Sequence, residues 1–199
     1  RDAGNVAAWA ALGNAAYAIG QRTRGRACME RAAALGARPG SPDVANAAQM
    51  RLWLGHWRLG WQAYEGRREM SEWRAAMKEL PTLPGGPLAV RTGRWLRRLS
   101  EGRYGVLDAR PVIVVSEQGQ GDAVQFARFV PLVAERLQVP VWFRVHTALV
   151  PMMQGAFAGD ARIRILDKGD TLGPEEVQGW VPLMSLPHFL GITNARELP

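Results

Sequence analysis

The chain has 199 residues, 47% of them hydrophobic, which is enough to bury the cores of one large or two small domains. Its formal net charge is +7, and all but two of its 25 basic residues are arginine, the exceptions being Lys78 and Lys168. Excess charge alone supports only non-specific attraction to nucleic acid, so the composition argues against that function. No run of 18 apolar residues is present, and Cys28 is the single cysteine. We therefore expect a cytoplasmic globular protein that does not enter a membrane.

The first third of the sequence is alanine-rich and repeats itself at an offset of 35 residues. Three positions of the first copy have counterparts in the second: Gly20, Gly25 and Met29 recur as Gly55, Gly60 and Tyr64. The offset is close to the period of about 34 residues in tetratricopeptide repeats, which are helix-turn-helix units. Trp9-Ala-Ala-Leu12-Gly13 matches the opening of that motif.

This pattern predicts pairs of antiparallel helices. We expect the small residues Gly13, Gly20 and Gly25 to let two helices approach closely. An apolar seam would come from the larger side chains of the first copy, namely Trp9, Leu12, Tyr17 and Met29. The second copy predicts helices over residues 43–54 and 58–67. Two repeats bury little surface alone, so the array would continue upstream or dock on the C-terminal part of the chain.

Three tryptophans in the second copy, Trp53, Trp57 and Trp61, are spaced by four residues. An aromatic platform for a ligand is one interpretation, and packing within and between repeats is the other. We favour packing, because Gly55-His56 interrupts the helix between the first two.

Residues 68–110 are rich in proline, glycine and arginine and predict a linker, with a short helix over Thr92–Ser100. Six arginines and two acids lie between Arg91 and Arg110. A solvated connector is the simpler interpretation of this segment. The alternative is a basic surface that binds nucleic acid with a steep dependence on salt.

From residue 111 onward, strand and helix patterns alternate, which predicts a parallel sheet covered on both faces. The expected strands are 112–116, 139–145, 162–166 and 177–183, the expected helices are 122–137 and 148–157, and a short helical turn covers 186–191. Only about 89 residues are available for this region. The sheet should therefore be half, or less, of a doubly wound domain.

A glycine loop, Ser116-Glu-Gln-Gly-Gln-Gly-Asp122, comes directly after the first expected strand. A phosphate-binding P-loop would need a lysine and a hydroxyl residue after the glycines, and a dinucleotide fingerprint would need a small residue at Val124. Asp122 would also place a negative charge where a pyrophosphate binds. Two interpretations remain: Asp122 is an ionised general base on a loop that Gly119 and Gly121 allow to turn, or it merely caps the next helix.

Two motifs resemble a known family. They are Ser116-Glu-Gln-Gly-Gln-Gly-Asp-Ala-Val-Gln-Phe-Ala-Arg-Phe-Val-Pro-Leu132 and Val181-Pro-Leu-Met-Ser-Leu-Pro187. Both resemble bacterial tetratricopeptide-repeat proteins with a C-terminal region similar to heptosyltransferases and other glycosyltransferases of two Rossmann-like domains. The preceding Gly60-Trp61-Gln-Ala-Tyr64-Glu65-Gly-Arg67 resembles the motif that ends their repeats. Gln178 and Trp180 depart from the acidic and histidine residues that the family often has before the second motif.

The resemblance implies an inverting transfer from a nucleotide sugar to a protein hydroxyl, with Asp122 as catalytic base and no metal or other cofactor. The helical repeats would bind the protein acceptor or another protein partner. Residues lining the acceptor side would be Gln118, Gly119, Gly121, Gln125 and, more weakly, Ser185. The histidines His56, His146 and His188 stand too far apart in sequence to form a metal-ligand motif.

The expected fold class is α + α/β. Tetratricopeptide-type helical repeats at residues 1–67 would precede the linker 68–110 and a partial Rossmann-like domain at 111–199. In the resembled enzymes a second domain binds the nucleotide sugar, so we expect this sequence to be a fragment that lacks the donor-binding half. The alternative function is a non-catalytic repeat module for protein–protein interaction.

Overall fold

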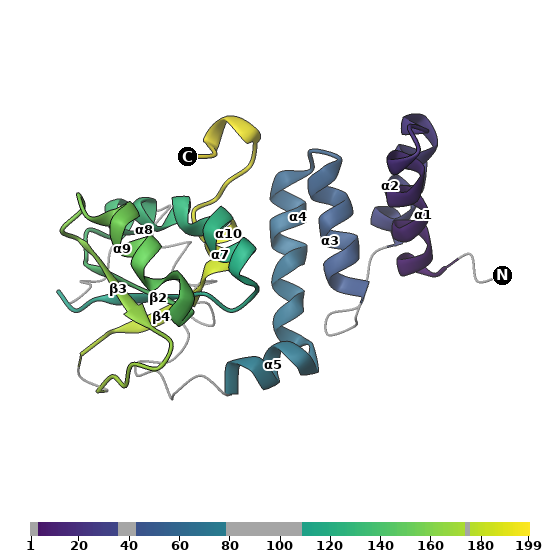
Figure 1. Cartoon of the computed structure of the whole chain (residues 1–199). Coiled ribbons are helices and arrows are strands. Elements are labelled where there is room, and N and C mark those ends of the chain that lie inside the picture. Colours follow the sequence, from purple (N-terminus) through teal and green to yellow (C-terminus); the bar gives the residue numbers. More distant parts are fainter. Residues whose placement is uncertain (1–3, 36–42, 79–108, 174–175) are drawn as a thin grey trace. The chain divides into compact units, whose positions relative to one another are not determined.

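The computed structural model describes residues 4–35, 43–78, 109–173 and 176–199 (Figure 1). These residues fall into two compact units. One contains helices α1 to α4 together with Gly191–Leu198, and the other contains a parallel β-sheet with its helices. The expected combination of a helical N-terminal region with an α/β region is therefore confirmed. No helix in the described ranges is long and apolar enough to cross a membrane.

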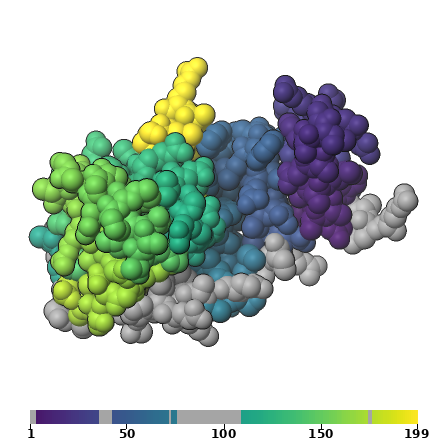
Figure 2. Space-filling model, viewed as in Figure 1, coloured from purple at the N-terminus to yellow at the C-terminus, as the bar shows by residue number. Residues whose placement is uncertain are grey.

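The helical unit consists of two helix pairs, and within each pair a short turn joins the first helix to the second. Its elements are α1 (Val6–Ala18), α2 (Arg22–Leu35), α3 (Asp43–Trp53), α4 (Trp57–Tyr64), the 3-10 helix η1 (Glu65–Glu69) and, near the C-terminus, the 3-10 helix η5 (Ala195–Glu197). Helix α1 begins at Asn5, whose side chain accepts a hydrogen bond of 2.8 Å from the Ala8 amide. In the space-filling view the α1–α2 pair (purple) abuts the α3–α4 pair (blue), and α3 packs against both α1 and α2 (Figure 2).

The two helix pairs end their first helices in the same way. Gly20 and Gly55 have positive φ angles of 81° and 82°. After α1, the amides of Gly20 and Gln21 donate to the carbonyls of Tyr17 and Ala16. After α3, Gly55 and His56 donate to Leu52 and Arg51, which are the same positions shifted by 35 residues. Each turn satisfies the last carbonyls of its helix, and each needs a residue that tolerates the left-handed region.

Gly25 and Gly60 mark where each second helix approaches its first. A Cβ built on Gly25 would lie 2.4 Å from Cδ2 of Tyr17, and one on Gly60 would lie 2.6 Å from Cδ2 of Leu52. Gly13 contributes to the first approach, because its Cβ would lie 2.9 Å from Cγ of Met29. The expectation of close packing at Gly13 and Gly25 is confirmed. For Gly20 it is wrong: a Cβ there would meet nothing within 4 Å, and this glycine serves the turn.

The apolar seam of the helical unit differs from the expectation at Leu12. Met29 is fully buried and Trp9 packs against the same core, whereas Leu12 is 40% exposed. Of the three tryptophans, Trp61 is buried, whereas Trp53 is 61% exposed. The ring of Trp53 still contacts Tyr17 of the first helix pair edge to face at 5.1 Å, as packing between repeats predicts.

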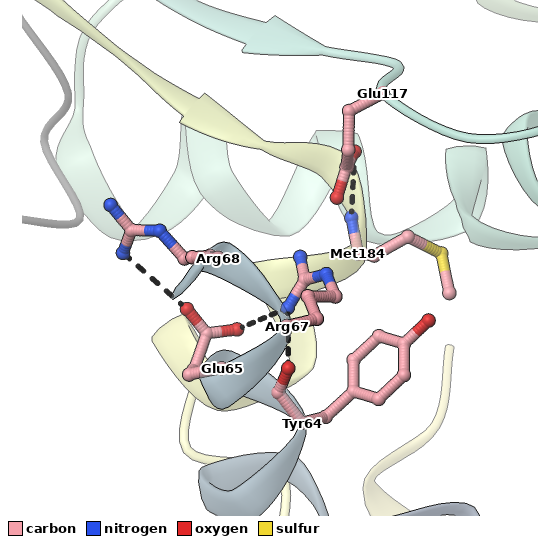
Figure 3. Close-up of polar contacts among 6 residues, drawn as sticks. All are labelled: Tyr64, Glu65, Arg67, Arg68, Glu117 and Met184. Atoms are coloured by element: carbon pink, nitrogen blue, oxygen red, sulfur yellow. Dashed lines mark hydrogen bonds and ion pairs between the residues drawn. The ribbon is translucent and has the colours of Figure 1, made fainter. Parts of the chain in front are cut away.

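A buried arginine closes the end of the second pair. Arg67 is 2% exposed, and its Nη1 donates to the Tyr64 carbonyl at 3.0 Å and to Glu65 Oε1 at 2.9 Å (Figure 3). Its guanidinium carbon lies 4.5 Å from the centroid of the Tyr64 ring. Glu65 also pairs with Arg68 at 3.6 Å. The last residues of the Gly60–Arg67 motif thus form a packed end to α4.

The segment after Arg67 begins as a helix, although we expected a linker from residue 68. Helix α5 covers Ser71–Lys78 directly after η1. The expected helix at Thr92–Ser100 and most of the arginine-rich segment 91–110 lie outside the described residues.

The second unit is a four-stranded sheet in which every described strand pair is parallel. Its elements are β1 (Val112–Val115), α7 (Gln120–Phe126), η2 (Ala127–Phe129), α8 (Val130–Leu137), β2 (Val141–Val145), η3 (Thr147–Leu149), α9 (Val150–Phe157), β3 (Ile163–Asp167), β4 (Gly179–Pro182), η4 (Leu183–Ser185) and α10 (Leu186–Phe189). The strand order is β3-β2-β1-β4, with Val114 of β1 in register with Phe143 and Val181.

Both faces of β1 are buried, as a parallel sheet requires. All four of its residues are 0% exposed. Helix α8 packs on β2 and β3 and α9 packs on β3, and the ring of Phe143 meets Phe157 edge to face at 6.2 Å. On the other face, Ile113 and Val115 cluster with Val177 and with the partly buried side chains Trp142, Leu172 and Trp180.

The helix expected over residues 122–137 is two helices. Residues Ala127–Phe129 form the 3-10 turn η2, and Pro131 stands in the first turn of α8. Proline has no N–H to donate and its ring clashes with the preceding turn, so it starts a helix more readily than it continues one. Pro151 stands in the first turn of α9 in the same way, after the 3-10 turn η3.

The close approach of α2 to α1 can be tested by adding one methyl group. We expect Gly25→Ala to lower the free energy of unfolding by about 1–3 kcal/mol, because the new Cβ overlaps the Tyr17 ring. Chemical denaturation followed by circular dichroism measures this change. Gly155→Ala is the control, since its Cβ in α9 would meet nothing within 4 Å and alanine favours a helix. Equal stability of both variants would contradict the close approach.

Candidate functional site

The carboxyl edge of the sheet is the candidate site. Because the strands are parallel, the loops after β1, β2, β3 and β4 all leave from this edge. β1 is central, with β2 and β3 on one side and β4 on the other, so the chain reverses its direction of travel across the sheet at β1. Ligands of open parallel sheets bind at the carboxyl ends of the strands beside such a reversal.

Asp122 stands at this edge, in the first turn of α7. The helix begins at Gln120 with Gly119 as N-cap, so Asp122 is the third helical residue and does not cap the helix. Its half-buried side chain turns back over the loop: a Cβ on Gly119 would lie 3.4 Å from Asp122 Oδ2.

The glycines of the loop do not act as we expected. Gly119 has φ −63° and ψ 163°, an extended conformation open to any residue, and Gly121 lies inside α7. Neither needs a glycine for its backbone geometry. Gly121 is exposed, and a Cβ there would meet nothing within 4 Å. Space is open at Gly121, whereas the Asp122 carboxylate lies against Gly119.

The loops after β1 and β4 are joined by a hydrogen bond. The amide of Met184 donates to Glu117 Oε2 at 3.4 Å (Figure 3). The structure thus brings together the two sequence motifs through residues that are 67 positions apart in the chain. Ser185, the next residue, is only 2% exposed, so its side chain supports the β4 loop from within.

Gln118 and Gln125 lie on either side of Asp122. Gln118 is half-buried, and its carbonyl oxygen lies 3.3 Å from Nε2 of His146, the first residue after β2. Gln125 is exposed on α7, where its carbonyl accepts a bond of 2.9 Å from Arg128 Nε. Gln118 is therefore tied to the neighbouring strand end, and Gln125 faces solvent.

Sequence reasoning missed a lysine–histidine pair at the ends of β2 and β3. Nζ of Lys168 lies 2.9 Å from Nε2 of His146, and both residues are half-buried. The same Nε2 also lies 3.3 Å from the Gln118 carbonyl, so the tautomer of the ring decides whether Nε2 accepts from Lys168 or donates to Gln118. The signal in the sequence is that polar residues follow the first three strands: Ser116 and Glu117 after β1, His146 after β2 and Lys168 after β3.

Arg144 holds the loop that carries Lys168. This residue of β2 is 0% exposed, and its guanidinium donates to three carbonyls of the loop after β3, those of Asp167 at 3.3 Å, Lys168, and Asp170 at 3.1 Å. Its Nη1 has no hydrogen-bond partner among the described residues. Burial lowers the pKa of Arg144, and the Asp170 and Asp167 carboxylates oppose that change.

Asp167 and Asp170 form hydrogen bonds that stabilise the conformation of the loop after β3. Asp167 Oδ1 accepts from the Gly169 amide at 2.7 Å and from the Thr147 hydroxyl at 3.1 Å, and these bonds lower the pKa of Asp167. Asp170 Oδ2 accepts from the Asp167 amide at 2.9 Å. In the described part of the chain, no group of three or more His, Cys, Asp or Glu side chains could hold a metal ion.

The helical unit has a cavity of its own, of about 560 Å³. Residues of α3, α4 and η1 line it, with Val44, Ala47 and Leu59 among the apolar ones. Arg51 and Glu69 add opposite charges to its wall. None of its lining residues belongs to the sheet unit, so this cavity and the carboxyl edge are separate features.

The pKa of Lys168 tests whether this side chain lies in the half-buried environment described for the carboxyl edge. Burial and, next, the charge of Arg144 lower this pKa, whereas Glu117 raises it. Because the chain has only two lysines, spectra of lysine-labelled protein should show two side-chain signals, which Lys78→Arg assigns. We expect Lys168 to titrate below the usual pKa of lysine, about 10.4, and still lower in Glu117→Gln.

Glu135→Gln, an exposed change on α8, is the control for that titration and should leave the Lys168 signal where it is. A Lys168 that titrates at or above the usual value would contradict the described environment.

Comparison with known proteins found no matching family model, no significantly similar curated protein and no significantly similar solved structure. The geometry of the carboxyl edge and the residues of the two motifs are therefore the basis for inferring a function.

Proposed function

We propose that the chain is the acceptor-binding part of a repeat-linked protein glycosyltransferase. The observation that carries the proposal is the position of Asp122 at the carboxyl edge, beside the central strand and next to a β4 loop joined to its own loop through Glu117. The neighbouring Gly121 leaves open space, since a Cβ there would meet nothing within 4 Å. A carboxylate that can reach an acceptor hydroxyl can act as its general base.

The strand order supports a Rossmann-like interpretation of the second unit. β3-β2-β1-β4 corresponds to the first strands of the order 3-2-1-4-5-6 found in doubly wound domains. In the described part of the connection from β3 to β4, the chain returns past β1 without a regular helix. The unit would then be a partial domain of this class, as its length suggests.

The helix pairs support a tetratricopeptide-type interpretation of the first unit. Their turns and close approaches recur at the same offset of 35 residues, at Gly20 and Gly55 and at Gly25 and Gly60. The second pair ends with the buried Arg67 cluster (Figure 3). Repeats of this type use extended surfaces to bind other proteins, so these helices would bind the acceptor.

In the proposed reaction, an acceptor hydroxyl attacks the anomeric carbon of a nucleotide sugar. Its oxygen forms the new glycosidic bond while the bond to the diphosphate breaks, and the nucleoside diphosphate leaves with that electron pair. Asp122 takes the proton of the hydroxyl as the attack proceeds. Attack from the face opposite the leaving group inverts the anomeric centre.

Asp122→Asn keeps the shape of the side chain and removes the base. We expect transfer by the intact gene product, measured with nucleotide sugars and its protein acceptor, to fall by about 100-fold or more, because general-base catalysis contributes about 10²–10⁴. Glu135→Gln on the exposed face of α8 is the control and should retain activity. Full activity of Asp122→Asn would refute the assignment.

A second candidate is a non-catalytic module for protein–protein interaction. The cavity of about 560 Å³ among α3, α4 and η1 favours it, because that cavity could accept a side chain of a partner. Binding of a nucleotide sugar by the intact gene product, measured by calorimetry, would count against a purely non-catalytic module.

A further inference from the structure

The outer face of α1 is apolar and exposed. It consists of Ala8, Leu12, Ala15 and Ile19, which recur at intervals of four, three and four residues and therefore lie along one side of the helix. Leu12 is 40% exposed, and Ile19 at the C-cap is 70% exposed. Helix α1 contains no charged residue, whereas the exposed side of α2 is mostly charged. An exposed apolar face of this kind indicates an interaction surface.

The second helix pair shows what such a face does when it is covered. At the offset of 35 residues, Leu12 and Ala15 correspond to Ala47 and Met50 of α3. Ala47 and Met50 are 1% and 2% exposed, and they belong to the core cluster that joins α3 to the first helix pair. The positions that bury α3 against a preceding helix pair are thus open in α1. Because terminal units of helical arrays normally have a polar outer face, this apolar face should have an occupant.

A second copy of the chain cannot cover this face in a head-to-tail contact. In the first helix pair, Met29 and Ala32 of α2 contribute to the surface on which α3 packs. Their counterparts in the second pair, 35 residues later, are Tyr64 and Arg67. Both are buried within their own chain, where Arg67 donates to the Tyr64 carbonyl and to Glu65. The surface that would dock on α1 of another copy is therefore already closed.

The outer face of α1 is, however, complementary to itself. When two copies of the helix run antiparallel about a two-fold axis midway between Leu12 and Ala15, Leu12 lies opposite Ala15 of the second copy and Ile19 lies opposite Ala8 of the second copy. Each large side chain then meets a small one, and the symmetry repeats every contact. Large side chains opposite small ones fill the space between two helices without a gap. Since α1 is uncharged, this contact desolvates no ionised group of the helix.

We propose that the outer face of α1 is a dimer interface, occupied by the same face of a second copy in the antiparallel arrangement. A helix of 13 residues offers a small contact, so the dimer should be weak, with a dissociation constant on the order of 1–100 μM. The interface requires no chemistry at Asp122, and it stands whether or not the proposed transfer occurs.

Analytical ultracentrifugation of the chain over a range from about 1 to 500 μM measures this association. We expect an equilibrium between monomer and dimer that shifts with concentration. Leu12→Glu should weaken the dimer by about tenfold or more, because the two copies would bury two carboxylates at the interface. Met152→Glu is the matched control: this methionine of α9 is exposed to a similar extent, 47%, and its replacement should leave the association unchanged.

An exchange of large and small residues tests the antiparallel pairing itself. Ala15→Leu adds exposed apolar area, so it would strengthen a non-specific hydrophobic association. In the proposed arrangement it instead sets two leucines against each other, and we expect the dimer to weaken severalfold. The double variant Leu12→Ala/Ala15→Leu again places each large side chain opposite a small one and should restore the dimer.

Three results would overturn the proposal. The first is an unmodified chain that stays monomeric over the whole range, which would leave the face to another occupant such as a further helix pair. The second is association that Leu12→Glu does not weaken. The third is association that Ala15→Leu strengthens or that the double variant does not restore. Circular dichroism checks the fold of each variant, and if Leu12→Glu does not fold, the unmodified chain, Ala15→Leu and the double variant still decide.

Discussion

The candidate site depends on one buried arginine. Arg144 has no exposed surface, and transfer of a guanidinium from water into a protein interior is unfavourable unless hydrogen bonds compensate. Three carbonyls of the loop after β3 provide that compensation. The bonds fix the loop to β2, and the fixed loop sets Lys168 against His146, which in turn lies against the carbonyl of Gln118. Arg144 thus orders a chain of contacts across three strand ends, up to the loop before Asp122.

Much of the fold is predictable from local patterns in the sequence. Val112–Val115 form a buried parallel strand because a short run of β-branched residues suits a strand covered on both faces. The repeat offset predicted that Gly20 and Gly55 occupy equivalent positions, and both end a helix at positive φ, although we had expected Gly20 at a close approach of two helices. The prediction of one uninterrupted helix over residues 122–137 was wrong, because a new helix begins around Pro131.

The candidate site was less predictable than the fold. Asp122 could be singled out because it lies shortly after a strand and in the first turn of a helix, both of which are local properties. His146 and Lys168 are 22 residues apart, and nothing local indicates that they touch. Their contact depends on which strands are neighbours, and pairing of β2 with β3 is a property of the whole sheet. The burial of Arg144 could not be predicted for the same reason, because nothing local distinguishes it from the exposed arginines of the chain.

A crystal structure of Arg144→Met tests this account most directly. Methionine fills a similar apolar volume but offers no donor, so a folded sheet is compatible with the change. We expect β2 to stay paired with β1 and β3, while the loop at residues 167–170 shifts and Lys168 Nζ moves out of hydrogen-bond distance of His146. An unchanged loop with the 2.9 Å contact intact would show that Arg144 does not order the carboxyl edge.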